Sequence, residues 1–409
     1  MTVSIFVGDC VESLRALPAD SAHCVVTSPP FFGLRDYGVD GQIGLESTID
    51  EHVTALVDVF REVKRVLRKD GTCWMEYGDA YATGNARKAT ETTPGGNHNK
   101  GFRSSARYSE SPTVGTPAGL KPKDLIGAPW RVAFALQADG WWIRSSIIWA
   151  RPNPMPESVT DRPTKSYSNV FLLTQSARYF YDADAVREKG AGRTDRSKGS
   201  RGRIEDQGWK GDELSESNGR NLRDVWTIPT HAFPGAHFAT FPPKIVEPCI
   251  KAGSSEKGCC AECGAPWERV VEKGRGLTAE DLGIDGSEAY QSDVSPISGG
   301  QGGQARKSRL SGSVQAAHKA ANPDKFLGWR PTCEHEGEPV PCTVLDPFGG
   351  AGTTALVADR LGRDAILCEL NAEYAEMARR RIYEDAPLFA AVEVLPGGGL
   401  AADEDTDAE

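Results

Sequence analysis

The sequence predicts an α/β domain with a mainly parallel sheet, because short apolar strands alternate with helices along the first eighty residues. Strands are expected at 3–7, 23–27 and 72–77. A short helix over 10–17 follows Asp9, whose side chain is placed to cap it. After a loop over 28–47, apolar residues recur at helical spacing from Val53 to Leu67, which indicates a longer helix.

The rest of the regular structure lies in two separate stretches. The first holds a helix at 124–138 and strands at 141–149 and 170–174. The second holds a strand at 343–346, a helix at 352–361, a strand at 364–369 and a helix at 371–382. Two strands cannot enclose a buried core alone, so the C-terminal strands should complete the sheet begun at the N-terminus. The sequence therefore predicts a circularly rearranged sheet, with residues near 28 and 346 in one site.

The charge of the chain is unevenly distributed. The net charge is −10, but residues 382–409 carry eight acidic residues and no Lys or Arg, which leaves 47 basic and 49 acidic residues elsewhere. That segment is expected to be an acidic, disordered tail. Residues 82–123 and 187–203 each hold seven basic residues against two acidic ones. A phosphate backbone interacts with local charge, so these stretches indicate nucleic-acid contact, with solvated loops as the alternative.

Composition also predicts the compartment. The chain has no apolar run of about 18 residues, which argues against a membrane-spanning helix. The segment MTVSIFVGDC lacks the pattern of a secretory signal, so we expect a cytoplasmic protein without a membrane partner. Its ten cysteines should then be reduced thiols or metal ligands.

The segment VLDPFGGAGTT, residues 344–354, runs from an apolar strand into glycines that open a helix. Gly350, Gly352 and Ala355 fit the dinucleotide pattern G-x-G-x-x-G/A, and Glu369 ends the next strand, where it can accept two ribose hydroxyls. No Lys-Ser/Thr follows the glycines, so the segment is not a phosphate-binding P-loop. The pattern favours a cofactor with one nucleoside and no phosphates, with an ordinary glycine turn as the alternative.

A second segment, TSPPF at 27–31, follows a buried strand directly. Two prolines fix the backbone and remove two donors, while their carbonyl groups remain acceptors. Rigid acceptors beside an aromatic ring suit a planar base with an exocyclic amine. The alternative is an ordinary proline-rich turn.

Together these segments resemble the DNA amino-methyltransferases, which act on cytosine N4 or adenine N6. The resemblance extends to GDCVESLRALP at 8–18, WIRSSIIW at 142–149, YFYD at 179–182 and FPPKIVEPCI at 241–250. Because the catalytic motif precedes the cofactor loop, the order is that of the β group. The resemblance implies a seven-stranded, doubly wound, Rossmann-like methyltransferase sheet with inserted DNA-recognition segments. It also implies double-stranded DNA as substrate and S-adenosylmethionine as cofactor.

The resemblance assigns roles residue by residue. Catalysis would fall to Ser28, Pro29, Pro30 and Phe31. The cofactor would be held by Asp9, Phe241, Asp346, Phe348, Gly350, Gly352, Thr353 and Glu369, with Asp9 at the adenine and Phe241 at the methionine end. Serine at position 28 favours cytosine N4 over adenine N6, and its hydroxyl would align the amine rather than remove a proton. An NAD-dependent oxidoreductase and a non-catalytic zinc-ribbon protein are the alternatives from other classes.

A third pattern indicates a metal. Cys260, Cys263, Cys333 and His335 form a Cys3His set of the kind that binds structural zinc as a knuckle. Cys249, Cys259 and Cys342 are competing ligands, and the alternative is a group of unrelated thiols.

These observations divide the chain into eight segments. They are 1–81 (catalytic half), 82–123 (basic insertion), 124–184 (continuation of the catalytic domain), 185–230 (target recognition), 231–258 (cofactor-closing helix), 259–342 (zinc knuckle with low-complexity linker), 343–383 (cofactor half) and 384–409 (acidic tail). The sequence leaves open whether the chain forms a homodimer and whether a cognate restriction endonuclease accompanies it.

Overall fold

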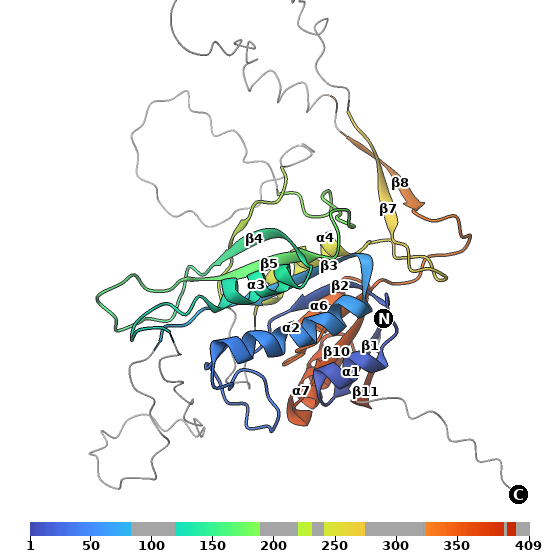
Figure 1. Ribbon diagram of the computed structural model, residues 1–409. Coiled ribbons are helices and arrows are strands. Elements are labelled where there is room, and N and C mark those ends of the chain that lie inside the picture. The colour runs from blue at the N-terminus through green and yellow to red at the C-terminus, as the bar shows by residue number, and fades with distance from the viewer. Residues whose placement is uncertain are drawn as a thin grey trace, which may run out of the picture. The chain divides into compact units, whose positions relative to one another are not determined.

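The computed structural model describes residues 1–82, 119–188, 220–230, 241–274, 322, 324–387 and 391–397 (Figure 1). The chain divides into two compact units. The first comprises Met1–Val186, Arg223–Glu268 and Pro331–Glu409, and the second comprises Arg187–Leu222 and Arg269–Arg330.

A nine-stranded sheet of order β11-β1-β10-β9-β2-β3-β5-β4-β6 forms the centre of the first unit. Its strands are β1 (Thr2–Val7), β2 (Ala22–Thr27), β3 (Leu67–Tyr77), β4 (Trp142–Ala150), β5 (Tyr167–Thr174), β6 (Val225–Thr227), β9 (Thr343–Asp346), β10 (Asp364–Glu369) and β11 (Ala391–Pro396). Neighbours are parallel except that β5 runs antiparallel to β3 and β4. Because β9 pairs with both β2 and β10, the two ends of the chain share one sheet, as the sequence predicted.

The seven predicted strands are all present and lie next to one another, from β1 to β4 in the sheet order. The prediction of seven strands is nevertheless too low, because β11 and β6 extend the two edges. β6 has only three residues, and the periodicity of so short a strand is too weak to detect.

The prediction of a disordered tail over 384–409 is wrong for residues 391–396, which form β11 against β1. The segment AVEVLP is apolar enough to add a strand, and Glu393 accepts a hydrogen bond of 2.7 Å from Ser4 Oγ. The prediction failed because the acidic residues beyond 402 dominate the composition of the whole tail.

Helices α1 (Cys10–Ala16), α2 (Ile49–Val66) and α3 (Ala128–Ala138) cover one face of the sheet. Leu14, Phe60 and Leu136 bury their side chains there against Val25 and Met75. In Figure 1, α2 runs along this face of the sheet. α3 starts four residues later than predicted, because Gly127 at its N-cap has a φ of +73° and Pro129 occupies its first turn.

Helices α4 (Pro243–Gly253), α6 (Thr353–Arg360) and α7 (Ala372–Asp385) cover the opposite face. α4 approaches the sheet so closely that a Cβ on Gly253 would lie 2.3 Å from Thr72 Oγ1 and 2.8 Å from Cys24 Sγ. Gly352 has the same function between α6 and α7, because a Cβ there would lie 2.8 Å from Ala378 Cβ.

A second sheet has two strands, β7 (Trp267–Glu272) and β8 (Lys325–Pro331). Neither strand was predicted, because the sequence of 259–342 indicated only a knuckle and a linker. Arg269 stacks on Trp329 and Phe326, with its guanidinium 4.5 and 5.3 Å from the two ring centroids.

Several predicted segments lie mainly outside the described residues. These are most of the basic insertion 82–123, most of 185–230, the low-complexity stretch within 259–342 and the end of the tail. Among the described helices, none is long and apolar enough to cross a bilayer.

Candidate active site

A cavity of about 380 Å³ lies where β1, β2, β9 and β10 end, at the carboxyl edge of the parallel strands. This edge is where open α/β sheets bind ligands. The predicted residues that line the cavity are Asp9, Ser28, Pro29, Pro30, Phe31, Phe241, Phe348, Gly350, Thr353 and Glu369. Two segments more than 300 residues apart in sequence, 28–31 and 347–351, therefore face one space.

Asp346 and Gly352 do not line the cavity. The buried carboxylate of Asp346 accepts hydrogen bonds from Thr27 Oγ1 at 2.7 Å, Thr354 Oγ1 at 2.8 Å and the Phe348 N–H at 3.1 Å. Burial raises its pKa to about 7, against the opposing effect of these bonds. Asp346 thus joins the end of β2, one residue before Ser28, to the glycine turn, and Gly352 packs α6 on α7.

Gly350 and Glu369 form the turn that faces the cavity. The Gly350 N–H donates to Glu369 Oε2 at 2.7 Å, and the Asn371 N–H donates to Oε1 at 2.9 Å. Burial raises the pKa of Glu369, although both bonds favour its ionised form. Each carboxylate oxygen can accept more than one hydrogen, so Glu369 keeps acceptor capacity toward the cavity.

Asp9 caps α1 as predicted and also lines the cavity. Its Oδ1 accepts the N–H groups of Val11 at 2.8 Å and Glu12 at 3.0 Å. Both bonds use one oxygen of the carboxylate. The side chain is therefore fixed at the cavity wall, with its second oxygen available for a donor.

Ser28 has a buried partner that the sequence did not predict. Ser28 Oγ donates to Glu76 Oε2 at 2.7 Å. Glu76 is the penultimate residue of β3, is only 5% exposed and lines the same cavity. Burial raises its pKa, while hydrogen bonds from Ser28 and Ser168 and the charge of Arg151 oppose the rise. The available signal was an acid inside the otherwise apolar strand TCWMEY.

Phe31 packs against the end of β3. Its ring centroid lies 4.8 Å from that of Tyr77, with a tilt of 41°. A Cβ on Gly78 would lie 2.7 Å from Phe31 Cε2, so only glycine fits beside the ring at that position.

Basic side chains border the Ser28 end of the cavity. Arg151 lines it, stacks on Trp149 at 5.1 Å and donates to Ser168 Oγ at 3.0 Å. Lys165 donates to the carbonyl of Asp79, and burial lowers the pKa of its amine to about 8. The positive charges of both groups act on Glu76 and oppose the rise of its pKa.

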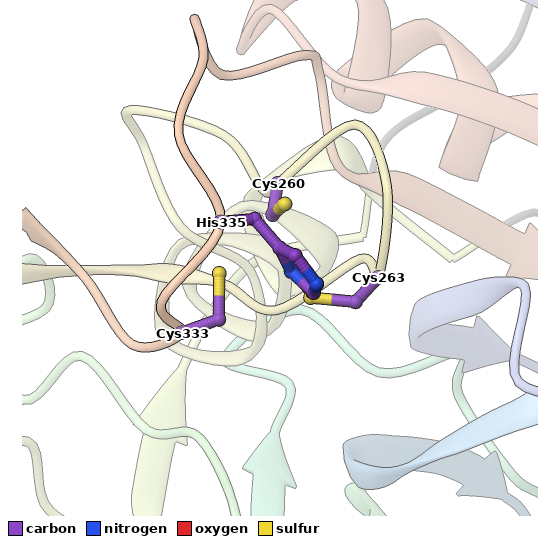
Figure 2. A group of neighbouring side chains, drawn as sticks. All are labelled: Cys260, Cys263, Cys333 and His335. Atoms are coloured by element: carbon purple, nitrogen blue, oxygen red, sulfur yellow. The ribbon is translucent and has the colours of Figure 1, made fainter.

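The predicted metal ligands lie together, with the ligand atoms of Cys260, Cys263, Cys333 and His335 all within 4.8 Å of one another. Figure 2 shows the four side chains converging from two segments of the chain, and His335 Nδ1 lies 3.2 Å from Cys263 Sγ. Tetrahedral zinc with bonds of about 2.3 Å to sulfur requires ligand atoms roughly 3.8 Å apart, so the donor set fits the ion.

The competing ligands are arranged differently. Cys259 and Cys342 lie near His23, but both ring nitrogens of His23 have partners: Nδ1 is 3.0 Å from the Thr343 N–H and Nε2 is 2.9 Å from the Gly264 carbonyl. Cys249 is buried in α4 and donates to the Ile245 carbonyl. Neither arrangement matches the Cys3His set as a zinc site.

The Cys3His group lies far from the cavity along the strands. Arg68, near the start of β3, donates to the Cys263 carbonyl at 2.6 Å, and His23, near the start of β2, contacts Gly264. Ser28 and Glu76 lie at the opposite ends of these strands. A metal held by this group would therefore not reach the cavity.

The fold and the cavity define the class: an α/β protein with a ligand-sized cavity at the carboxyl edge of its parallel strands, beside a Ser-Pro-Pro-Phe segment. A family model described as DNA methylase matches residues 22–261 and 341–380. The chain belongs to this family and is a DNA amino-methyltransferase, which confirms the resemblance and excludes the oxidoreductase and the non-catalytic zinc protein.

Relatives extend the match over most of the chain. The type II methyltransferase M.SmaI of Serratia marcescens is 34% identical over 92% of this chain and 90% of its own length. M.Cfr9I of Citrobacter freundii is 45% identical over 61% of this chain and 72% of its own length. A protein of Thermus thermophilus, solved with S-adenosyl-L-methionine and proposed to be a DNA modification methylase, is 18% identical with a TM-score of 0.46, over 96% of this chain and 99% of that one.

Proposed function

We propose that this enzyme methylates the exocyclic amine of a base in double-stranded DNA at a specific sequence, and that the base is cytosine, methylated at N4. The observation that carries the proposal is that Ser28 and Gly350 line one cavity. Ser28 represents the catalytic segment and Gly350 the cofactor turn. The catalytic segment comes first in the chain, which is the order typical of the β group.

The cofactor end of the cavity has the hydrogen-bond acceptors and the apolar surface that S-adenosylmethionine needs. Asp9 and Glu369 offer carboxylate oxygens to an adenine amine and to ribose hydroxyls, and Phe241 and Phe348 offer apolar surface. Gly350 and Thr353 lie where the backbone has to approach the ligand closely. When bound, S-adenosylmethionine supplies an electrophilic methyl group. Asp346 supports the site from behind, since it holds the turn without facing the cavity.

The base end of the cavity aligns an amine. Ser28 gives its only hydrogen to Glu76, so the lone pairs of Ser28 Oγ are free to accept an N–H of the base. The Pro29 carbonyl is a second acceptor on a backbone that proline keeps rigid. Phe31 can stack on the ring, and base–aromatic stacking is worth roughly 1–3 kcal/mol. The base has to leave the helix stack to reach this wall.

The amine also has to lose a proton when its nitrogen gains a methyl group. The Ser28 hydroxyl alone is too weak a base to remove this proton, but it can take the proton while passing its own to Glu76, so we infer that the Ser28–Glu76 pair is the base. Burial raises the pKa of Glu76, which makes its carboxylate a stronger base than an ordinary glutamate.

Serine at position 28 favours cytosine N4, and adenine N6 is the alternative within the same family. The test is mass spectrometry of nucleosides from DNA treated with the enzyme and methyl-labelled cofactor. Label in N4-methylcytosine supports the proposal, whereas label only in N6-methyladenine overturns the choice of base. The DNA should come from a host without its own amino-methyltransferases, so that unmethylated target sites are present.

We further propose that Cys260, Cys263, Cys333 and His335 hold one structural zinc ion. The ligand distances and the closed Cys3His set support it, and the position at the amino ends of β2 and β3 supports a structural role. The two cysteines that precede β7 and the two ligands after β8 would then be joined by the ion. We also propose that residues 185–230 recognise the target sequence. Membership of this family is the ground for two further proposals, a homodimer and a cognate restriction endonuclease.

A further inference from the structure

Three residues outside the cavity form a buried chain of hydrogen bonds behind the Pro-Pro-Phe segment. Glu46 lies in the loop before α2, His52 in the first turns of α2, and Tyr77 at the end of β3. His52 Nδ1 lies 2.8 Å from Glu46 Oε2, and His52 Nε2 lies 2.6 Å from the Tyr77 hydroxyl. His52 and Tyr77 are both 0% exposed, so water does not compete for the bond between them, and the Glu46 side chain is only 17% exposed.

The bonds of Glu46 fix the direction of the chain. Burial would raise the pKa of Glu46, but hydrogen bonds from His52 and from the N–H groups of Glu46 and Gly44 outweigh it and hold the pKa below its ordinary value. Glu46 is therefore an acceptor, and His52 Nδ1 carries the hydrogen that it accepts. In a neutral imidazole Nε2 is then an acceptor, which takes the hydroxyl hydrogen of Tyr77.

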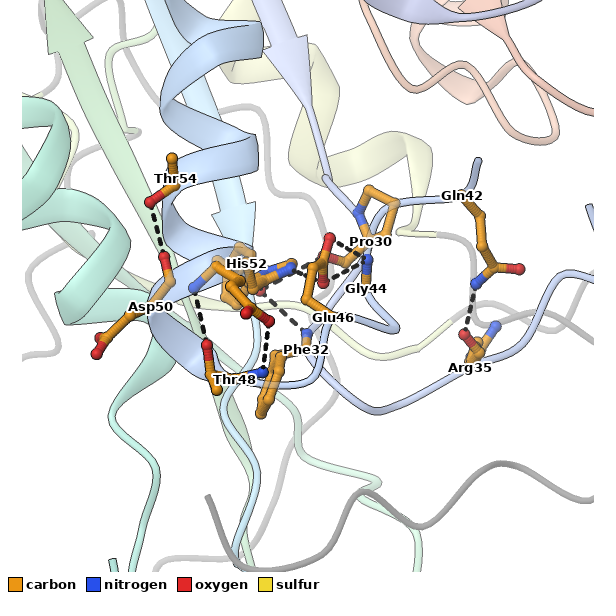
Figure 3. Close-up of polar contacts among 12 residues, drawn as sticks. Pro30, Phe32, Arg35, Gln42, Gly44, Glu46, Thr48, Asp50, His52 and Thr54 are labelled. Carbon is orange, nitrogen blue, oxygen red and sulfur yellow. Dashed lines mark hydrogen bonds and ion pairs between the residues drawn. The ribbon is translucent and has the colours of Figure 1, made fainter. Parts of the chain in front are cut away.

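Each end of this chain holds one end of the cavity loop. The Tyr77 oxygen accepts the N–H of Phe32 at 3.2 Å and lies 3.4 Å from the Pro30 carbonyl. Glu46 accepts the N–H of Gly44 at 3.1 and 3.0 Å. Figure 3 shows Glu46 between His52 and Gly44, with Pro30 and Phe32 alongside.

The loop between these two anchors forms much of the cavity wall. Its lining residues are Leu34, Arg35, Tyr37, Val39, Gly41, Gln42 and Ile43. The loop is closed by a further bond of 2.8 Å from the Gly33 N–H to the Gly44 carbonyl. The Tyr77 ring packs against Phe31 at the same time, with centroids 4.8 Å apart. The same tyrosine thus fixes the backbone after the catalytic segment and the ring of its last residue.

We propose that Glu46, His52 and Tyr77 are positioning residues for methyl transfer, which hold Phe31 and the proline carbonyls in the geometry that aligns the target amine. The inference rests on the proposed function, because it takes these groups to hold the base. None of the three lines the cavity, so they act through the segment rather than on the substrate. A misplacement of about 1 Å at a reacting centre can cost roughly a hundredfold in rate.

The test is Tyr77→Phe, which keeps the ring against Phe31 and removes only the hydroxyl. The single-turnover rate of DNA methylation should fall about tenfold or more, because the segment loses its anchor. The dissociation constant for S-adenosylmethionine, measured by calorimetry, should stay unchanged, because the cofactor end of the cavity is untouched. Tyr383→Phe is the matched control, since Tyr383 lies half exposed on α7 and outside the cavity, and its rate should equal that of the wild type.

Glu46→Gln tests the far end of the chain and perturbs the core less. If the three residues act as one unit, the double variant Glu46→Gln/Tyr77→Phe should be no slower than Tyr77→Phe alone. If the rate reductions of the two single variants multiply in the double variant, the residues act separately, which overturns the proposal.

Other outcomes are equally decisive. An unchanged rate for Tyr77→Phe overturns the positioning role. So does a rate that falls only in proportion to the folded fraction, measured by circular dichroism at the assay temperature. If the wild type itself transfers no methyl group to DNA, the proposed function fails instead, and the comparison of variants is not reached.

Discussion

Ser28 Oγ donates a hydrogen bond of 2.7 Å to Glu76 Oε2, across two neighbouring strands of the sheet. The bond directs the hydroxyl hydrogen of Ser28 toward Glu76 and so fixes the rotation of the hydroxyl. A serine that would otherwise rotate freely therefore presents its lone pairs to the ligand. In the proposed mechanism, the raised pKa of Glu76 makes its carboxylate a better base for the proton that the substrate amine loses.

Glu76→Gln should lower the methylation rate while S-adenosylmethionine binds as before. Glutamine nearly preserves the shape but removes the charge and the base, and loss of a positioned base typically costs about a hundredfold or more. The measurement is single-turnover kinetics beside calorimetry of cofactor binding. Glu247→Gln, an exposed glutamate on α4, is the control and should leave the rate unchanged. A Glu76→Gln enzyme as fast as the wild type would remove Glu76 from the mechanism.

The Ser28–Glu76 pair also predicts how the methylation rate depends on pH. Burial raises the pKa of Glu76, so its carboxylate becomes protonated at a higher pH than an ordinary glutamate. The protonated carboxyl group cannot take up a further proton through Ser28, so the rate of the wild type should fall as pH is lowered through this raised pKa. The rate of Glu76→Gln should lack this acidic limb. If the rate of both enzymes falls in the same way at low pH, the titrating group is not Glu76.

Gly350→Ala should weaken cofactor binding. Gly350 has a φ of +49°, and its Cβ would meet no atom closer than 4.0 Å, so the methyl would project into the cavity that the residue lines. We expect at least a tenfold higher dissociation constant for S-adenosylmethionine, which corresponds to about 1.4 kcal/mol. The strain of alanine at positive φ adds a stability cost of about 1 kcal/mol.

Gly362→Ala is the matched control for that strain. Gly362 has a φ of +75° at the end of α6 and does not line the cavity. It should lose a similar amount of stability in thermal unfolding but bind the cofactor normally. Equal loss of affinity in both variants would mean that strain, and not the cavity, explains the effect.

The sequence predicted the seven central strands because each is a short apolar run between turn signals. It also predicted that residues near 28 and 346 share a site, because two C-terminal strands need a sheet to join. It could not predict Glu76 or the Glu46–His52–Tyr77 chain. These contacts join residues 48, 6 and 25 positions apart, and only strand pairing and the packing of α2 bring them together. It assigned Asp346 to the ligand because a motif does not show on which side of the backbone a carboxylate lies.

Asp346→Asn should change how stability depends on pH. The pKa of Asp346 is about 7 in the folded protein against an ordinary value of 3.8, so the folded state binds more protons than the unfolded state between these values. Its contribution to stability is therefore full below pH 4 and is lost as pH rises toward 7, at no more than about 1.4 kcal/mol per pH unit. Thermal unfolding from pH 4 to 8 should show the stability of the wild type falling relative to that of Asp346→Asn. A difference in stability between the wild type and Asp346→Asn that stays constant from pH 4 to 8 would contradict the raised pKa of Asp346.

Removal of the metal should destabilise the protein without changing the chemistry at Ser28. The Cys3His group joins the segment before β7 to the segment after β8, and it lies at the ends of β2 and β3 opposite the cavity. Purified protein should contain about one zinc per chain, as expected for a closed structural site. Cys333→Ser should lose the ion and lower the unfolding temperature. Cys249→Ala, which removes a buried thiol outside the group, should keep the ion. Zinc-free protein that unfolds at the same temperature as the zinc-loaded form would refute the structural role.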